Sequence, residues 1–202
     1  MAYLILVRHG ESLWNAKGLW TGLTDIPLSE KGRKESKLVA LALKNVKFDI
    51  AYTSPLIRAK QTLDEIKRVL SYRKLETVEN GALNERDYGD LTGKNKWKIE
   101  KEYGEEKFTK IRRGWDYPIP SGETLRDVFN RVVPYYKQEI FPKLKEGKNA
   151  LIVAHGNSLR ALVKYVENIS DKDIEKLEIA TGEIYIYSFD EEGSIVSKEI
   201  KK

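Results

Sequence analysis

Short apolar runs recur along the chain, and longer stretches with apolar residues at helical spacing separate them. Three runs of six residues are almost free of polar side chains: 2–7, 48–53 and 149–154. Runs this short and this apolar are typical of strands buried on both faces of a parallel sheet. A further strand is predicted at 75–80, and a last strand or a terminal hairpin at 183–189 and 194–200.

The amphipathic stretches predict helices with recognisable ends. Residues 28–45 predict a helix that Ser29 caps, and residues 54–70 predict one with Ser54 as the N-cap and Pro55 at the first helical position. The second of these helices is therefore expected to follow its strand without an intervening loop.

Three later segments are predicted to be helical at least in part. Residues 122–147 predict a long helix that Pro134 and Pro142 bend or interrupt. Residues 94–113 are more polar and predict a mixture of helix and loop. A last helix begins after Gly156, where the third apolar run has ended.

Apolar strands separated by helices predict an α/β fold. We expect residues 1–202 to form a single three-layer domain with a mostly parallel central sheet flanked by helices. In such folds ligands bind at the carboxyl ends of the strands. Catalytic or ligand-binding residues are therefore expected where the apolar runs end.

The only two histidines, His9 and His155, each end an apolar run, and each is followed by glycine. Glycine makes up 14 of 202 residues, so chance would place it after both with odds of about one in two hundred. Two separate strands would deliver both imidazoles to the same rim of the sheet.

The residues around the histidines are suited to binding a phosphoryl group. A neutral imidazole such as His9 is a good nucleophile towards phosphorus, and Arg8 can bind phosphoryl oxygens through its planar fork. A helix N-terminus follows His155, and Arg58 lies in the first turn of another helix. An isolated Arg-His-Gly more often contains a structural histidine, either in the core or at a helix cap. The second His-Gly pair is what favours a catalytic role.

Composition bounds the remaining alternatives. The formal charge of +5 fits either a solvated lysine surface or an anionic partner, which would be nucleic acid or a phosphorylated small molecule. There is no cysteine, no apolar run long enough to span a membrane and no signal-peptide pattern. We therefore expect a cytoplasmic protein with no membrane association, and we find no nucleic-acid-binding motif.

Longer strings resemble a known family. RHGESLWN, TSPLIRAKQT, LNERDYG and AHGNSLRALV resemble the histidine phosphatase superfamily. WTGLTDIPLSEKG, LNERDYGDLTGKNK and YGEE…IRRGWDYP resemble its cofactor-dependent phosphoglycerate mutases. The likeness runs from about residue 3 to about residue 189. It implies interconversion of 3-phosphoglycerate and 2-phosphoglycerate, in glycolysis and gluconeogenesis, through a phosphohistidine primed by 2,3-bisphosphoglycerate, without a metal.

The resemblance also assigns roles to individual residues. His9 would carry the phosphoryl group, with Arg8, Arg58 and His155 around it, and Glu85 would donate and accept the proton. Asn15 would also contact the phosphoryl group, and Gly156 would form the turn that admits it. The matched positions for the substrate's carboxylate and second phosphate are Ser12, Thr21, Gly22, Tyr88, Lys96, Arg112, Arg113 and Asn157.

The chain also departs from the family pattern. Leu23 and Ile111 stand where the family commonly has tryptophan, which we interpret as packing changes. An insertion between Pro120 and Gly122 and most of a mobile C-terminal tail are missing. Because that tail shields the phosphohistidine from water, its loss favours phosphatase leakage. Members of the family differ in assembly, so the chain is expected to be a homodimer or a monomer.

Two rival functions remain. The nearer one is a phosphatase of small phosphate esters that uses the same His9 with water as the acceptor. Lys96, Arg112 and Arg113 speak for the mutase, since a phosphatase of small esters need not bind the far end of its substrate. The other rival is a non-enzymatic binder of phosphorylated ligands or nucleic acid, against which the set of His9, Glu85 and His155 argues.

Overall fold

The computed structural model describes residues 1–202 and contains one six-stranded sheet with the strand order β3-β2-β4-β1-β5-β6. β1 to β4 run parallel to one another, while β5 is antiparallel to β1 and to β6. The strands are β1 Ala2–Arg8, β2 Ile50–Thr53, β3 Glu76–Glu79, β4 Ala150–Ala154, β5 Ile184–Phe189 and β6 Ile195–Lys201. The helices are α1 Leu13–Ala16, α2 Glu30–Ala42, α3 Ile57–Val69, α4 Lys96–Tyr103, α5 Glu105–Arg113, α6 Leu125–Tyr135, α7 Phe141–Lys145 and α8 Gly156–Val166.

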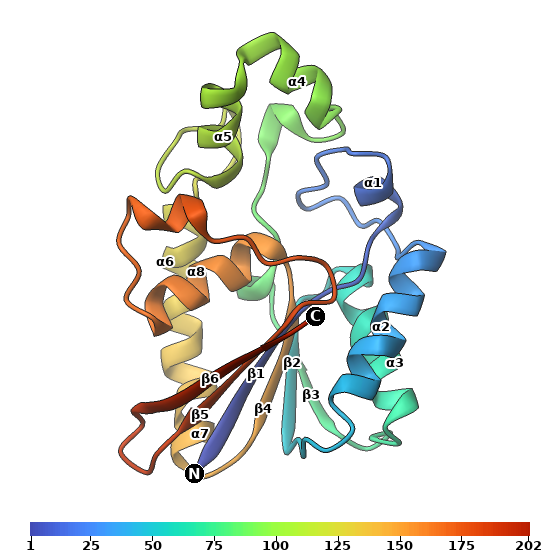
Figure 1. Ribbon diagram of the computed structural model, residues 1–202, viewed down its shortest axis with the longest axis vertical. Coiled ribbons are helices and arrows are strands. Elements are labelled where there is room, and N and C mark those ends of the chain that lie inside the picture. The colour runs from blue at the N-terminus through green and yellow to red at the C-terminus, as the bar shows by residue number, and fades with distance from the viewer.

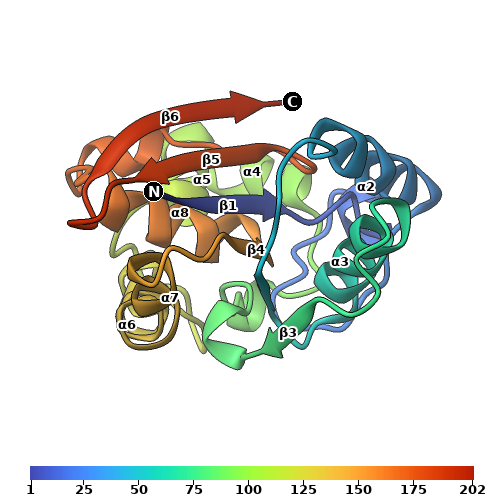
Figure 2. The same cartoon turned by 90° about the horizontal axis from the view of Figure 1, so that it is seen from below.

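Helices cover both faces of the sheet and make three layers, with α2 and α3 on one face and α6, α7 and α8 on the other (Figures 1 and 2). The alternation along β1 explains why both faces are covered. Leu4 and Leu6 belong to the apolar cluster of the α6 and α8 side, and Ile5 and Val7 to the cluster of the α2 and α3 side. A strand that is apolar on both faces requires a helical layer on each.

Helices α4 and α5, residues 96–113, form a cap that stands beyond the carboxyl ends of the parallel strands (Figure 1). The cap has an apolar cluster of its own, in which Phe108 and Ile111 pack with Trp20, Tyr88 and other side chains. Cap and sheet thus enclose the rim where the sequence places its histidines. None of the helices is both long and apolar enough to cross a membrane.

Most of the predicted elements are confirmed. The six strands lie where the apolar runs predict them, the last two form an antiparallel hairpin, and Ser29 caps α2. Residues 94–113 are more helical than predicted, since Gly104, at φ 80°, divides two helices without a loop between them. Ile111 is buried in the cap, but Leu23 is exposed and is therefore not a packing change.

The predicted start of α3 is wrong by two residues. The helix begins at Ile57, and its N-cap position is Leu56 instead of Ser54. Asp25, from a distant segment, accepts the N–H of Ile57 at 2.6 Å and so supplies the missing cap. The Ser54 hydroxyl contacts His155 instead, at 2.6 Å from its Nε2 atom. A tertiary contact has overridden the local capping signal.

The interruption predicted in 122–147 occurs at only one of the two prolines. Helix α6 continues through Pro134, and a π-helical turn at Tyr136–Ile140 then leads into α7, which has Pro142 in its first turn. Proline has no N–H for the carbonyl four residues earlier, and the wider π turn accommodates that missing bond.

The turn after β1 is locked against the first turn of α2. Ser29 donates its backbone N–H to the Glu11 carbonyl at 2.9 Å, and Gly10 donates to the Thr62 hydroxyl at 3.1 Å. A Cβ atom on Gly32 would lie 2.0 Å from the Glu11 carbonyl oxygen. The backbone approach that holds His9 in place therefore requires glycine at position 32.

We predict that Gly32→Ala destabilises the protein by about 1–3 kcal/mol, because backbone must move to admit the methyl group. Urea unfolding followed by circular dichroism measures the difference. Gly81→Ala is the control, since the atom nearest to a Cβ there is 3.7 Å away. Equal stability of the two variants would show that the turn is not locked against α2.

Candidate active site

The two histidines meet because their strands are neighbours. β1 and β4 pair in parallel with Arg8 opposite Ala154, and the N–H of His9 donates to the Ala154 carbonyl at 3.0 Å. The residues that follow, His9 and His155, place their rings edge to face with centroids 4.9 Å apart. The rim expected from the sequence is thus formed by adjacent strands.

His9 is held as a neutral imidazole. Its Nδ1 atom lies 2.6 Å from the Gly10 carbonyl oxygen, which only accepts hydrogen bonds, so Nδ1 carries the proton and Nε2 keeps its lone pair. Burial, and after it the charges of Arg58 and Arg8, hold the pKa of His9 well below 6.5. An unprotonated Nε2 is the form that can attack phosphorus.

The buried Arg58 and the half-buried Arg8 lie beside His9 and donate to backbone carbonyls instead of carboxylates. Arg58 donates to the carbonyls of Gly22 and Thr24 at 2.8 and 2.9 Å, and burial lowers its pKa to about 10, so it stays charged at neutral pH. Arg8 donates to the Ile179 carbonyl, and its buried Nε has no partner. Neither guanidinium forms a direct ion pair with a carboxylate, and an anion between these groups would stabilise their charge.

Glycine at 156 admits the Arg8 guanidinium to the N-terminus of α8. A Cβ atom at this position would lie 3.3 Å from Cζ of Arg8, closer than most side chains tolerate. The free N–H groups of the helix and the guanidinium therefore converge on one spot.

The hydroxyl of Ser54, which was predicted to cap α3, contacts the ring of His155 instead and orients it. The Ser54 hydroxyl accepts the N–H of Leu56 at 3.3 Å and lies 2.6 Å from Nε2 of His155, to which its own proton can be donated. In that tautomer Nδ1 carries the imidazole proton, and Nδ1 is buried without a partner. Burial and the charge of Arg58 hold the pKa of His155 well below 6.5. The ring is a neutral donor that lacks an acceptor.

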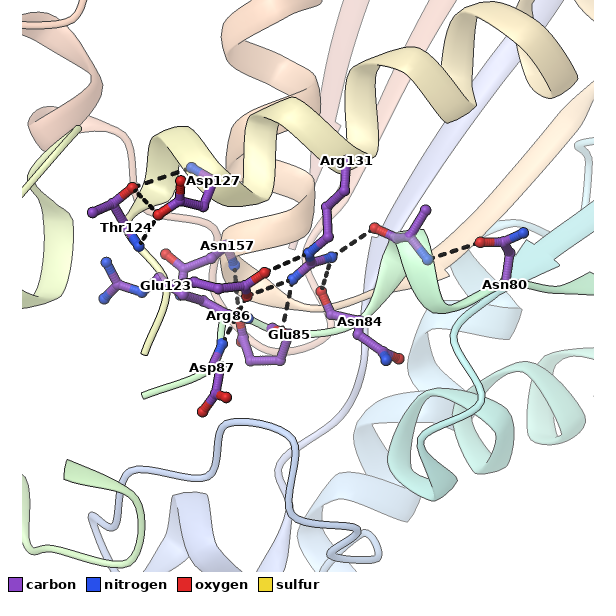
Figure 3. Close-up of polar contacts among 11 residues, drawn as sticks. Asn80, Asn84, Glu85, Arg86, Asp87, Glu123, Thr124, Asp127, Arg131 and Asn157 are labelled. Carbon is purple, nitrogen blue, oxygen red and sulfur yellow. Dashed lines mark hydrogen bonds and ion pairs between the residues drawn. The ribbon is translucent and has the colours of Figure 1, made fainter. Parts of the chain in front are cut away.

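Glu85 is fixed at the opposite side of the same pocket by one of its two oxygens. Oε1 accepts from the N–H of Arg86 at 2.8 Å and from the backbone and side-chain nitrogens of Asn157 at 3.1 and 3.0 Å (Figure 3). Burial opposes ionisation, but these bonds and the charges of Arg8 and Arg58 outweigh it and hold the pKa of Glu85 below its ordinary value. Glu85 is therefore a carboxylate with Oε2 ready to accept a proton.

The cap contributes a second group of cations. Lys96, Arg112 and Arg113 line the same pocket, and burial with the charge of Arg112 lowers the pKa of Lys96 to about 8. Glu178 pairs with both arginines, closely with Arg113 and at 3.9 Å with Arg112. With Arg8, Arg58 and Arg160, six cationic side chains face two carboxylates in the pocket, which therefore attracts anions.

Most residues that the sequence predicts for the site come together around this pocket. Its lining includes Arg8, His9, Asn15, Thr21, Gly22, Arg58, Glu85, Tyr88, Lys96, Arg112, Arg113, Gly156 and Asn157. His155 lies behind the lining, against the ring of His9. Ser12 is not brought to the pocket, because its hydroxyl accepts the N–H of Asn15 at 3.1 Å and caps α1.

Five lining residues were not singled out from the sequence, because only the fold brings them to the pocket: Trp20, Arg160, Leu177, Glu178 and Ile179. Arg160 had a detectable signal, since it lies one helical turn after Asn157 and donates to its Oδ1 at 3.0 Å. It also donates to the carbonyls of Arg113 and Ile174, and so ties the cap to α8. No comparable local pattern marks Glu178.

The pocket suits a bisphosphorylated acid better than it suits a metal ion. No three side chains of histidine, cysteine, aspartate or glutamate come together as candidate metal ligands. Four of the buried polar atoms without a partner belong to residues at the pocket: Nε of Arg8, Nε1 of Trp20, Oγ1 of Thr21 and Nδ1 of His155. Donors of this kind match phosphoryl oxygens, so the residues present fit 2,3-bisphosphoglycerate.

The sequence matches one protein family along almost all of its length. The profile of the histidine phosphatase superfamily (branch 1) matches residues 4–200. A 2,3-bisphosphoglycerate-dependent phosphoglycerate mutase from Chelativorans sp. (strain BNC1) is 49% identical over 98% of this chain and 97% of its own. The mutase of that name from Bradyrhizobium diazoefficiens is 48% identical over 96% and 95%.

Solved structures share the fold. YhfR from Bacillus stearothermophilus superposes with a TM-score of 0.83 at 26% identity, and covers 96% of this chain and 94% of its own. A mycobacterial glucosyl-3-phosphoglycerate phosphatase superposes with a TM-score of 0.81 at 21% identity, over 100% and 98%. The α/β fold predicted from the sequence is confirmed.

We predict that neither histidine titrates near pH 6.5. The unfolded chain binds a proton on each ring near that pH, whereas the folded pKa of both is well below it. Below about pH 6.5 the unfolded state therefore binds more protons, and the free energy of unfolding falls by up to about 1.4 kcal/mol per histidine and pH unit.

Nitrogen-15 NMR of the two rings measures the titration, and His9→Gln assigns the signals. In this variant the pH dependence of unfolding should lose the share of His9, while that of His155 remains. A ring that titrates near pH 6.5 would contradict the burial described here.

Proposed function

Because the chain belongs to branch 1 of the histidine phosphatase superfamily, we propose that it acts through a phosphohistidine at His9. The reaction is that of a 2,3-bisphosphoglycerate-dependent phosphoglycerate mutase, the interconversion of 3-phosphoglycerate and 2-phosphoglycerate in glycolysis and gluconeogenesis. Relatives of that name, 45–49% identical over nearly the whole chain, support this activity.

The second group of cations is the observation that favours these substrates. Arg8, Arg58 and His155 surround the nucleophile, while Lys96, Arg112 and Arg113 come from the cap. A phosphoglycerate carries a carboxylate as well as a phosphate, and a bisphosphoglycerate has one phosphate more. A pocket with cations on the rim and on the cap can bind both ends of such a molecule and orient it for transfer.

In the first half of the reaction the phosphoryl group leaves Nε2 of His9. The bond between phosphorus and nitrogen breaks while a hydroxyl oxygen of the monophosphate forms a bond to phosphorus. Glu85 is ionised because its pKa is lowered, so Oε2 has a lone pair free to accept the hydroxyl proton. Arg8, Arg58 and the N-terminus of α8 stabilise the charge on the transferring oxygens.

In the second half the other phosphoryl group returns to the enzyme. Nε2 of His9 attacks that phosphorus, the bond to the substrate oxygen breaks, and Glu85 gives its proton back to this oxygen. Free 2,3-bisphosphoglycerate supplies the phosphoryl group that primes His9, held by the same cations. The neutral Nδ1–H of His155 then donates to a phosphoryl oxygen.

We predict that purified protein converts 3-phosphoglycerate to 2-phosphoglycerate faster when 2,3-bisphosphoglycerate is added. A coupled assay measures the rate, and intact mass after incubation with the bisphosphate shows one added phosphoryl group. His9→Ala should lose both, since Nε2 of His9 is the unprotonated nitrogen at the rim. A variant that still gains the mass would place the phosphoryl group on another residue.

We predict that replacing Arg112 and Arg113 together by alanine separates the mutase from the phosphatase activity. Each replacement removes charge-assisted hydrogen bonds of roughly 1.5–3 kcal/mol, so kcat/KM for phosphoglycerate should fall about a hundredfold or more. Hydrolysis of a small aryl phosphate should change far less, because it has no second anionic end.

The matched control replaces Lys107 and Lys110, which lie on the same helix outside this pocket, and removes the same charge. If both activities of the arginine variant drop in parallel, the two arginines serve the common phosphoryl step or the fold. The proposal would then lose its main support over a simple phosphatase.

A further inference from the structure

Arg131, on α6, uses all five of its guanidinium N–H groups. It donates to the carbonyl oxygens of Ala82, Asn84 and Glu85 at 2.7, 3.0 and 3.0 Å (Figure 3). The other two hydrogens go to the two carboxylate oxygens of Glu123, both at 2.9 Å. A guanidinium with every donor satisfied has one orientation, and so do the groups that it binds.

The groups that it binds all lie next to Glu85. The three carbonyl oxygens that bind Arg131 belong to the segment 82–85. Beyond Glu85, the Glu123 carboxylate accepts the N–H of Asp87 at 2.9 Å. Glu123 returns its own N–H to the Asp87 carbonyl at 2.9 Å. The backbone is thereby held on both sides of Glu85.

Neither Arg131 nor Glu123 lines the pocket, so neither touches a substrate there. Their effect on the reaction has to pass through the segment that they hold. The Glu85 carboxylate reaches the pocket from this segment, and Oε1 is bound to Asn157, so a shift of the backbone would redirect Oε2.

We propose that Arg131 and Glu123 are positioning residues that aim the proton-transferring oxygen of Glu85 at the substrate. The inference rests on the proposed function in one respect, the role of Glu85 as the proton carrier. A misplacement of a catalytic group by about 1 Å can cost about a hundredfold in rate. Loss of the pair should therefore impair the proton step and leave the nucleophile His9 intact.

The dependence on the leaving group separates these two effects. Transfer of a phosphoryl group from p-nitrophenyl phosphate to His9 needs no proton donor, because p-nitrophenolate leaves as a stable anion. Transfer from glycerol 2-phosphate needs one, because an alkoxide is a poor leaving group. The test compares kcat/KM for hydrolysis of both compounds by Arg131→Lys, Glu123→Gln and Glu85→Gln.

We expect Glu85→Gln to lose activity towards glycerol 2-phosphate selectively. Arg131→Lys and Glu123→Gln should share this profile, with a loss of about tenfold or more for glycerol 2-phosphate and less than about threefold for p-nitrophenyl phosphate. Arg126→Lys is the control, because its side chain is exposed on the same helix and lies 4.0 Å from Asp116.

Three results would overturn the inference in distinguishable ways. If Arg131→Lys and Glu123→Gln lose both activities in parallel, the pair supports only the fold. If they lose neither, the pair does not position Glu85. If Glu85→Gln itself shows no preference for the leaving group, the proton role of Glu85 fails, and the inference falls with it. Glu123→Gln keeps the shape of the side chain and one of its two acceptor oxygens, so it remains informative if the arginine variant does not fold.

Discussion

The parallel register between β1 and β4 is the constraint on which the site depends. It sets Arg8 opposite Ala154, so the next residue of each strand is a histidine at the same rim. A slip by one residue would turn every side chain of β1 to the other face, because side chains alternate along a strand. The apolar clusters on both faces of the sheet resist that slip, and packing energy thereby fixes the geometry of the nucleophile.

Charge is the second determinant of the site. Arg8 and Arg58 are held by backbone carbonyls, and the donor nitrogen of His155 has no acceptor. The fold bears the cost of this concentrated positive charge, which the phosphoryl group of the proposed reaction would offset. Burial, and after it the arginine charges, keeps both histidines neutral, while hydrogen bonds and the same charges keep Glu85 ionised. These are the protonation states that the proposed transfer requires.

Local sequence patterns predicted most of the fold and the centre of the site, because residues that are close in the sequence determine the burial pattern of a strand and the periodicity of a helix. The local patterns gave a wrong helix cap where a residue from a distant segment took that role. Asp25 caps α3 in place of Ser54, whose hydroxyl contacts His155. Glu178 and Arg131 were not predicted for the same reason, since the arginines that Glu178 pairs with and the carbonyls that Arg131 binds lie far along the chain. Motif strings identified the pocket residues, but only the fold shows what holds them in place.

The atom that carries the phosphoryl group tests the account most directly. Protein with nitrogen-15-labelled histidine, treated with 2,3-bisphosphoglycerate, can be examined by phosphorus–nitrogen correlation NMR. The Gly10 carbonyl requires a proton on Nδ1 of His9, so the account predicts a single phosphoryl group on Nε2 of His9. A phosphoryl group on Nδ1, or on His155, would contradict it.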